Sequence, residues 1–296
     1  MKTAGPPRVI FSRHEAVLAA FSSPKLFGGL FFIVITLVLS ILAPLFTPYT
    51  PEQIAGPKEA PPSAAHPFGT TLFGRDIFSQ TLYGLGATFG VGFFGGLIAT
   101  LLGAGLGFLA GYYGGTLIDE LIMMAVNVFL VIPLIAVLII ISAYLEFRGF
   151  VLEAVIVGLF NWPWAARAVR SQTLSLKNNE YVNLSRISAL PVRKLVWQDI
   201  AANMFAYLIL VFILQFSGCV LAAATLDFIG LGPTRGLSLG MVLHEAVNWG
   251  AINLGLWWWA ILPGAVLTAL ILSFFMVATG LDEALNPRLR RVRGVI

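Results

Sequence analysis

Six long apolar runs, separated by polar segments, constrain this chain more than any other feature. Each run is close to or above the roughly 20 residues that a helix needs to cross the hydrocarbon core of a membrane. Of the 296 residues, 58% are hydrophobic and only 11% are charged. Because lipid offers no hydrogen-bond partners to a bare backbone, we expect all six runs to be transmembrane helices in an all-α membrane protein. The runs are Leu26–Phe46, Leu85–Leu109, Ile118–Tyr144, Phe150–Val169, Phe205–Asp227 and Leu256–Gly280.

The distribution of Lys and Arg predicts how these spans are oriented. If the N-terminus is cytoplasmic, the inner segments hold 14 of these residues, with Arg167 and Arg170 counted among them, and the outer segments hold 4. Positive residues concentrate on the cytoplasmic side, so the pattern predicts that both termini are cytoplasmic. The first run is too long for the apolar part of a signal peptide, and we expect it to be retained as a span. The net charge of +4 therefore reflects orientation and does not indicate nucleic acid binding.

The segments between the runs complete the predicted organisation. Residues 1–25 form a cytoplasmic tail that is either an amphipathic helix on the inner leaflet or unstructured. Residues 26–46 form the first span, and residues 47–84, rich in Pro and Gly, form an extracytoplasmic loop. Residues 85–280 hold the other five spans and a polar loop at 175–203, and residues 281–296 form a second cytoplasmic tail.

The second run contains glycines at intervals of four. Gly103, Gly107 and Gly111 lie on one face of a helix, where they allow a second helix to approach closely. We therefore expect this span to be tightly packed near the centre of the bundle.

Several kinds of chemistry are missing from the sequence. No Gly-Lys dipeptide occurs, and the phosphate-binding P-loop requires one, so the chain has no nucleotide site of that kind. The three histidines lie in three different segments, and Cys219 is the single cysteine, so no metal-ligand spacing is present. No set of a nucleophile with an acid or base is recognisable. We expect that this chain is not an enzyme and binds no cofactor.

Polar side chains within the apolar runs are more informative. Asn127, Asn161 and Gln215 lie in the third, fourth and fifth runs, and Asp227 lies near the outer end of the fifth. Such groups are costly in lipid, so they should face the bundle interior or a wet path. A structural hydrogen bond between helices is the alternative.

Five motifs, in the same order along the chain, together carry a resemblance to a known family. They are "HPFGTTLFGRDIFSQTLYG" from His66, "GYYGG" from Gly111, "AARAVRSQTLSLKNNEYV" from Ala165, "LDFIGLG" from Leu226, and "WWWAILPG" from Trp257 with "GLDEALNPRLR" from Gly280. The chain resembles the C-type permease subunit of dipeptide and oligopeptide ABC importers.

The resemblance implies a function, a set of partners and a location. It implies the type I importer permease fold in the inner or plasma membrane, with peptides delivered by an extracytoplasmic solute-binding protein. The implied partners are a second homologous permease and two P-loop ATPase subunits, which bind the ATP and Mg²⁺. Nickel complexes or oligosaccharides are alternative solutes, and an ion-coupled secondary transporter is the alternative function.

In the resembled family, the loop between the fourth and fifth spans docks on the ATPase through two short helices. Residues 178–203 occupy this position, with expected helices at 181–189 and 192–203 and a break at Leu190–Pro191. Leu195, Val196 and Trp197 are expected to add apolar contact area. The chain departs from the family motif at its Glu-Ala-Ala and at its glycine. The expected contact residues are Asn183, Leu184, Ser185, Arg186, Ala189, Leu190, Pro191 and Lys194.

The motif at the end of the first outer loop is expected to be a folded element. It contains His66, Phe68, Gly74, Arg75 and Asp76, and we expect Arg75 and Asp76 to pair with each other. A structural role is favoured over solute contact, because exposed ion pairs contribute little energy.

Overall fold

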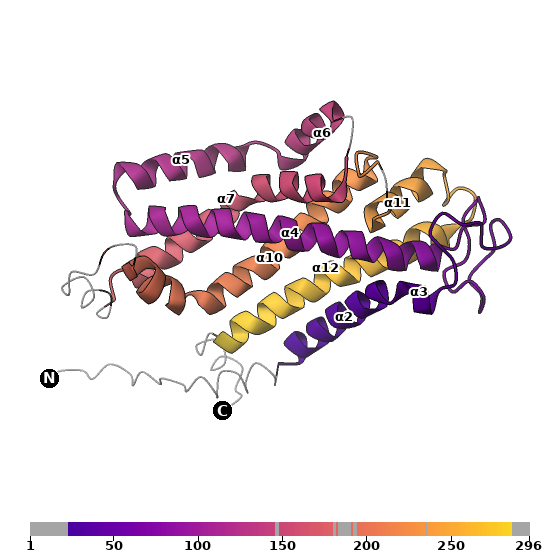
Figure 1. Cartoon of the computed structure of the whole chain (residues 1–296), viewed down its shortest axis with the longest axis horizontal. Coiled ribbons are helices and arrows are strands. Elements are labelled where there is room, and N and C mark those ends of the chain that lie inside the picture. The colour runs from indigo at the N-terminus through magenta and orange to yellow at the C-terminus, as the bar shows by residue number, and fades with distance from the viewer. Residues whose placement is uncertain are drawn as a thin grey trace.

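The chain folds into a bundle of long helices with a folded layer at one end (Figure 1). The computed structural model describes residues 23–145, 148–179, 182, 191, 194–234 and 236–285. Within these residues the regular structure is helical, apart from two isolated bridges, Ile54–Arg75 and Thr70–Asp76. The helices are α2 (Pro24–Ile41), α3 (Ala43–Phe46), α4 (Ile77–Tyr112), α5 (Leu117–Val131), α6 (Leu134–Tyr144), α7 (Phe150–Leu176), η1 (Leu195–Ala201), α10 (Phe205–Phe228), α11 (Leu239–Asn248) and α12 (Trp257–Leu285).

Four of the described helices are individually long and apolar enough to cross a membrane. They are α2, α4, α10 and α12, and the bent pair α5 and α6 makes a fifth if it counts as one span. Helix α7 is more polar, but it runs parallel to α4, with Gly95 against Ala154 at one end and Gly111 against Thr173 at the other. The prediction of a helical membrane protein is confirmed.

The third predicted span is wrong as a single helix. It divides into α5 and α6, whose axes differ by 79°. The break lies at Ile132 and Pro133, which both adopt extended backbone conformations, with ψ of 126° and 110°. Proline has no N–H to donate within a helix and disfavours helical conformation in the residue before it, which accounts for the break at this point.

The predicted close packing of the second span is confirmed. A Cβ atom added at Gly103 would lie 2.5 Å from the Cβ of Ala165, and one at Gly107 would lie 2.7 Å from the carbonyl oxygen of Ala166. Helix α4 is therefore pressed against α7 at backbone distance, where only glycine fits.

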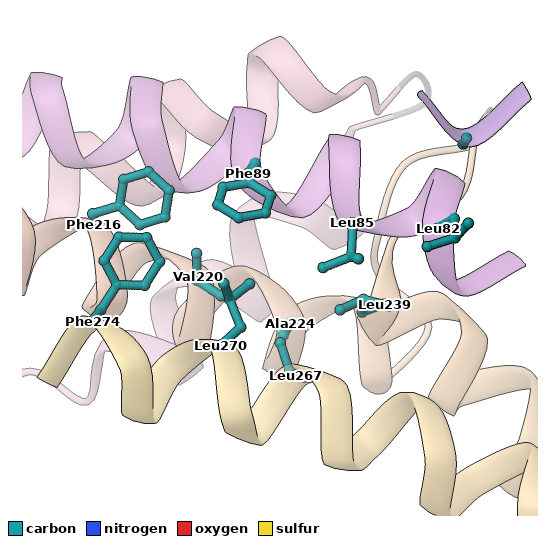
Figure 2. Packing of buried hydrophobic residues seen from close by; sticks show 11 residues of the cluster. Leu82, Leu85, Phe89, Phe216, Val220, Ala224, Leu239, Leu267, Leu270 and Phe274 are labelled. Carbon is teal, nitrogen blue, oxygen red and sulfur yellow. The ribbon is translucent and has the colours of Figure 1, made fainter. Parts of the chain in front are cut away.

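On its other side α4 packs against α10 and α12 through large apolar side chains (Figure 2). The Phe216 ring of α10 stacks on the Phe274 ring of α12 at a centroid distance of 4.2 Å, and Phe89 of α4 meets both rings edge-on. Helix α2 lies along α12, where Gly29 contacts the backbone of Ser273. Helix α4 is thus the central element of the bundle.

The folded layer, around residues 47–80 and 236–259, lies at the end that the sequence predicts to be extracytoplasmic and is named the outer layer. It contains a helix that the sequence analysis assigned to a loop. Helix α11 lies between α10 and α12, and the Ser238 hydroxyl caps its first turn by accepting from the Met241 amide at 3.2 Å. Helix α4 also begins at Ile77, before the predicted start of the span at Leu85, because Asp76 caps it.

Candidate functional site

Helices α5 and α7 are joined by an ion pair close to the ends that the sequence predicts to be cytoplasmic. The guanidinium of Arg170 donates to both carboxylate oxygens of Asp119, from Nε at 2.5 Å and from Nη2 at 2.6 Å. The Gly115 amide donates to the same carboxylate at 2.9 Å. Asp119 is buried, and such two-pronged pairs fix orientation as well as distance. The pair holds α5 against α7.

One turn earlier on α7, Arg167 makes a different contact. Its Nη2 donates to the Oδ1 atom of Asn127 on α5 at 2.7 Å, and both residues are exposed on the surface of this chain. The predicted orientation counts Arg167 with the cytoplasmic segments, although the fourth apolar run, Phe150–Val169, also includes it. Helix α7 continues to Leu176, nine residues or about 13 Å beyond Arg167.

Asn161 and Gln215 are brought together between α7 and α10. The Gln215 Nε2 atom donates to the backbone carbonyl of Asn161 at 2.7 Å, and the Asn161 amide donates to Val157 in its own helix at 3.0 Å. Gln215 is buried while Asn161 is partly exposed. Both side chains thus satisfy polar groups inside the bundle, and their place in a wet path stays a prediction.

Asp227 lies at the outer end of α10 and is buried within the chain. One of its carboxylate oxygens accepts from the Ser238 hydroxyl, which also caps α11. Gly232 and Gly240 pack so closely on Asp227 that an added Cβ would clash with it. The residue joins α10 to the outer layer, and its predicted role in a path is untested.

Six of the eight predicted contact residues lie outside the described residues: Asn183, Leu184, Ser185, Arg186, Ala189 and Leu190. Pro191 and Lys194 are described and exposed. The second half of the segment is helical, as η1, a π-helix. Leu195 was expected to be contact surface, but it is buried in this chain with Ile200, against the inner ends of α4 and α7.

The outer motif is a folded element, but its ion pairs differ from the prediction. Asp76 does not pair with Arg75: its Oδ1 lies 2.8 Å from His66 Nδ1, and its Oδ2 accepts from the Ser79 amide at 2.7 Å. Arg75 instead lies over the Phe73 ring. Because Asp76 is committed to capping α4, its carboxylate points into the layer and away from its neighbour's side chain.

Three further contacts organise this outer layer. Gly74 has a φ of +78°, and a Cβ there would lie 2.6 Å from the Gly56 carbonyl oxygen, so both the turn and the close approach favour glycine. Phe68 meets Phe78 edge-on at 5.3 Å. The Arg75 guanidinium is 4.0 Å from the carboxylate of Glu245 on α11, whose pKa is raised by burial and partly lowered again by Arg75.

The polar side chains described above connect helices to one another. No cluster of three or more metal-ligating side chains occurs among the residues described. The polar contacts are instead distributed from the outer layer to the ends of α5 and α7 that the sequence predicts to be cytoplasmic, and they join neighbouring helices.

Comparison with known proteins shows which family the chain belongs to. Residues 103–291 match the family model for the inner membrane component of binding-protein-dependent transport systems. The chain belongs to this family. It is therefore a multi-pass permease component of the inner membrane, in a transport system that includes a binding protein and an ATPase.

Curated relatives match almost the whole permease. The dipeptide transport system permease protein DppC of Bacillus subtilis is 32% identical over 268 residues, which cover 89% of this chain and 82% of the relative. DppC of Haemophilus influenzae is 33% identical over 89% of this chain and 90% of its own length. A putative peptide transport system permease of Brucella suis is 30% identical over 88% of this chain and 87% of its own. This membership supports the importer interpretation over an ion-coupled transporter.

Proposed function

We propose that this permease forms half of the translocation path of an ATP-driven importer for dipeptides or oligopeptides. A second homologous permease supplies the other half, two P-loop ATPase subunits bind ATP and Mg²⁺, and an extracytoplasmic solute-binding protein delivers the peptide. The observation that carries the proposal is the similarity, over more than four fifths of each relative, to permeases named for dipeptide or peptide transport.

The proposed topology has six spans with both termini in the cytoplasm. Helix α2 with α3, α4, the bent pair α5 and α6, α7, α10 and α12 supply these spans. Two observations support the inclusion of α7: it lies alongside α4 for most of its length, and Lys177 at its end donates to the carbonyl of Tyr112 at the end of α4 at 3.0 Å. The asymmetry of Lys and Arg supports the orientation.

The proposed mechanism is alternating access driven from residues 178–203. ATP binding closes the ATPase pair because ATP has higher affinity for the closed state, and the contact segment transmits this motion to the spans. Within the described part of this segment, η1 packs through Leu195 and Ile200 on α4 and α7, which supports its action as a rigid lever. Pro191 and Lys194 remain exposed for contact with the ATPase.

The first test is gentle affinity purification of the permease from its native membrane, followed by mass spectrometry and an ATPase assay. We expect a second permease and one or two P-loop subunits to copurify, and peptide-loaded binding protein to stimulate ATP hydrolysis. The reconstituted complex should then transport labelled dipeptide only when ATP is supplied on the side of the membrane where the ATPase subunits lie. A chain that purifies alone without ATPase activity would contradict the proposal, and uptake of nickel complexes or oligosaccharides in place of peptide would change the solute.

A further inference from the structure

Arg167 is a charged residue of α7 that has no acidic partner among the described residues. The ion pairs among the described residues join Lys25 to Glu283, His66 to Asp76, Arg75 to Glu245 and Arg170 to Asp119, and none of them includes Arg167. Its contact is the neutral amide oxygen of Asn127. A guanidinium carries five N–H donors, and this hydrogen bond uses one of them.

The direction of the side chain places the charge deep in the membrane. Side chains on a helix point toward its N-terminus, which is the outer end of α7 and the inner end of α5 in the proposed topology. Arg167 therefore reaches away from the cytoplasm and meets Asn127, which lies ten residues, about 15 Å, from the start of α5 at Leu117. A lipid-exposed arginine normally extends toward the nearer headgroups, and this one extends away from them.

The surface around Arg167 changes character along α7. Toward the outer end, Trp164 is exposed and apolar. Toward the inner end, Ser171 and Ser175 are exposed at successive intervals of four residues, so they lie on the same face of the helix as Arg167. A charge followed by hydroxyl groups on one exposed face is unfavourable against lipid and favourable beside water.

A peptide importer must hold solutes whose side chains differ. The groups that all such peptides share are the backbone and the two charged termini. The planar fork of arginine matches a carboxylate in two-pronged geometry, and the pairing is strengthened where water is scarce. The charge on Arg167 therefore fits the one anionic group common to every linear peptide.

We propose that Arg167, oriented by Asn127, binds the C-terminal carboxylate of the transported peptide as it passes the inner half of the membrane. This inference rests on the proposed function, because it takes the peptide as the solute. Arg170 is the matched contrast one turn away: its guanidinium is already committed to Asp119, so it serves the α5–α7 contact and not the solute.

The test is ATP-driven uptake by the reconstituted importer of a labelled dipeptide and of the same dipeptide with an amidated C-terminus. Each is supplied at a concentration that saturates the binding protein. We expect wild type to take up the free dipeptide about tenfold faster than the amide, or more. Arg167→Gln should slow the free dipeptide by a similar factor and leave the amide unchanged, while Arg167→Lys keeps part of the preference. Arg170→Lys should affect both peptides equally.

A second measurement examines whether the position is wet. In a Cys219→Ser background, Arg167→Cys in the assembled complex should react with a water-soluble, membrane-impermeant thiol reagent. No reaction in any nucleotide state would show that lipid or the partner permease covers this face, and would overturn the proposal. Equal slowing of both peptides by Arg167→Gln would overturn it too. If wild type takes up neither peptide with ATP, it is the proposed function that fails.

Discussion

The outer layer and the exposed surface between α5 and α7 differ in whether their polar side chains have partners within the chain. In the outer layer, His66, Asp76 and Ser79 satisfy one another inside the chain, and the Trp258 indole donates to the Thr70 carbonyl at 3.2 Å. On the α5–α7 face, Arg167 stands exposed with one amide partner. These outer-layer groups therefore have partners within the chain, whereas Arg167 has a single described hydrogen-bond partner.

Arg170 shows that the difference is not one of depth alone. It lies one turn from Arg167 on the same helix, yet two of its nitrogens donate to a buried carboxylate. The proposed contact with a peptide carboxylate would account for Arg167, a charge that has no carboxylate partner among the described residues.

The largest expected effect comes from removing the carboxylate of Asp76 in the outer layer. Asp76→Ala removes the cap of α4 and leaves His66 without its buried partner, so the free energy of unfolding should fall by about 3 kcal/mol. Unfolding in mixed micelles would measure this. Asp76→Asn keeps an oxygen for the Ser79 amide and should lose less. An alanine variant as stable as wild type would show that the layer is not held by this residue.

A smaller effect is expected where α4 meets α7. Gly103→Ala brings a Cβ to within 2.9 Å of the Ala166 backbone nitrogen and should cost about 1–3 kcal/mol through overpacking. Gly105 faces open space, so Gly105→Ala is a matched control that should be neutral or slightly stabilising. Thermal unfolding of the two variants side by side gives the comparison. Equal stability of the two variants would mean that α4 and α7 can move apart at little energetic cost.

Removing the ion pair between Arg170 and Asp119 should lower the free energy of unfolding by about 1–2 kcal/mol. Asp119→Asn leaves Arg170 without its charge partner, and the loss is moderated because 29% of the Arg170 side chain remains exposed to solvent. The double variant Asp119→Asn with Arg170→Gln should recover part of the loss, since no unpaired charge remains. A double-mutant cycle on the purified complex measures the coupling energy between Asp119 and Arg170. A coupling energy near zero would contradict a stabilising ion pair between α5 and α7.

Much of the bundle could be predicted from the sequence because lipid simplifies the problem. Apolar runs of sufficient length predict helices, and glycines at intervals of four correctly predicted that α4 is closely packed, although not that α7 is its partner. The break at Pro133 could have been found from the proline alone. Helix α11 was harder to predict, since ten residues with a short amphipathic pattern resemble an outer loop.

The polar contacts were less predictable, because they depend on which side chains meet in three dimensions. Arg75 and Asp76 are neighbours in sequence but point toward different elements, α11 and the His66 turn. The contact of Arg167 with Asn127 could not be predicted either, because it joins residues 40 positions apart in the sequence.

The smallest expected effect concerns the partly exposed ion pair between Arg75 and Glu245 in the outer layer. Arg75 and Glu245 are 4.0 Å apart and about a third exposed, so Arg75→Gln should lower the free energy of unfolding by less than about 1 kcal/mol at pH 7. Burial raises the pKa of Glu245, and Arg75 opposes that rise, so the loss should be present above this pKa, where the carboxylate is charged. It should fade as the pH falls through the pKa of Glu245, because a protonated carboxyl does not need the guanidinium. In a Glu245→Gln background the same change should have no effect at either pH. A loss that persists in that background would mean that Arg75 acts through the Phe73 ring instead.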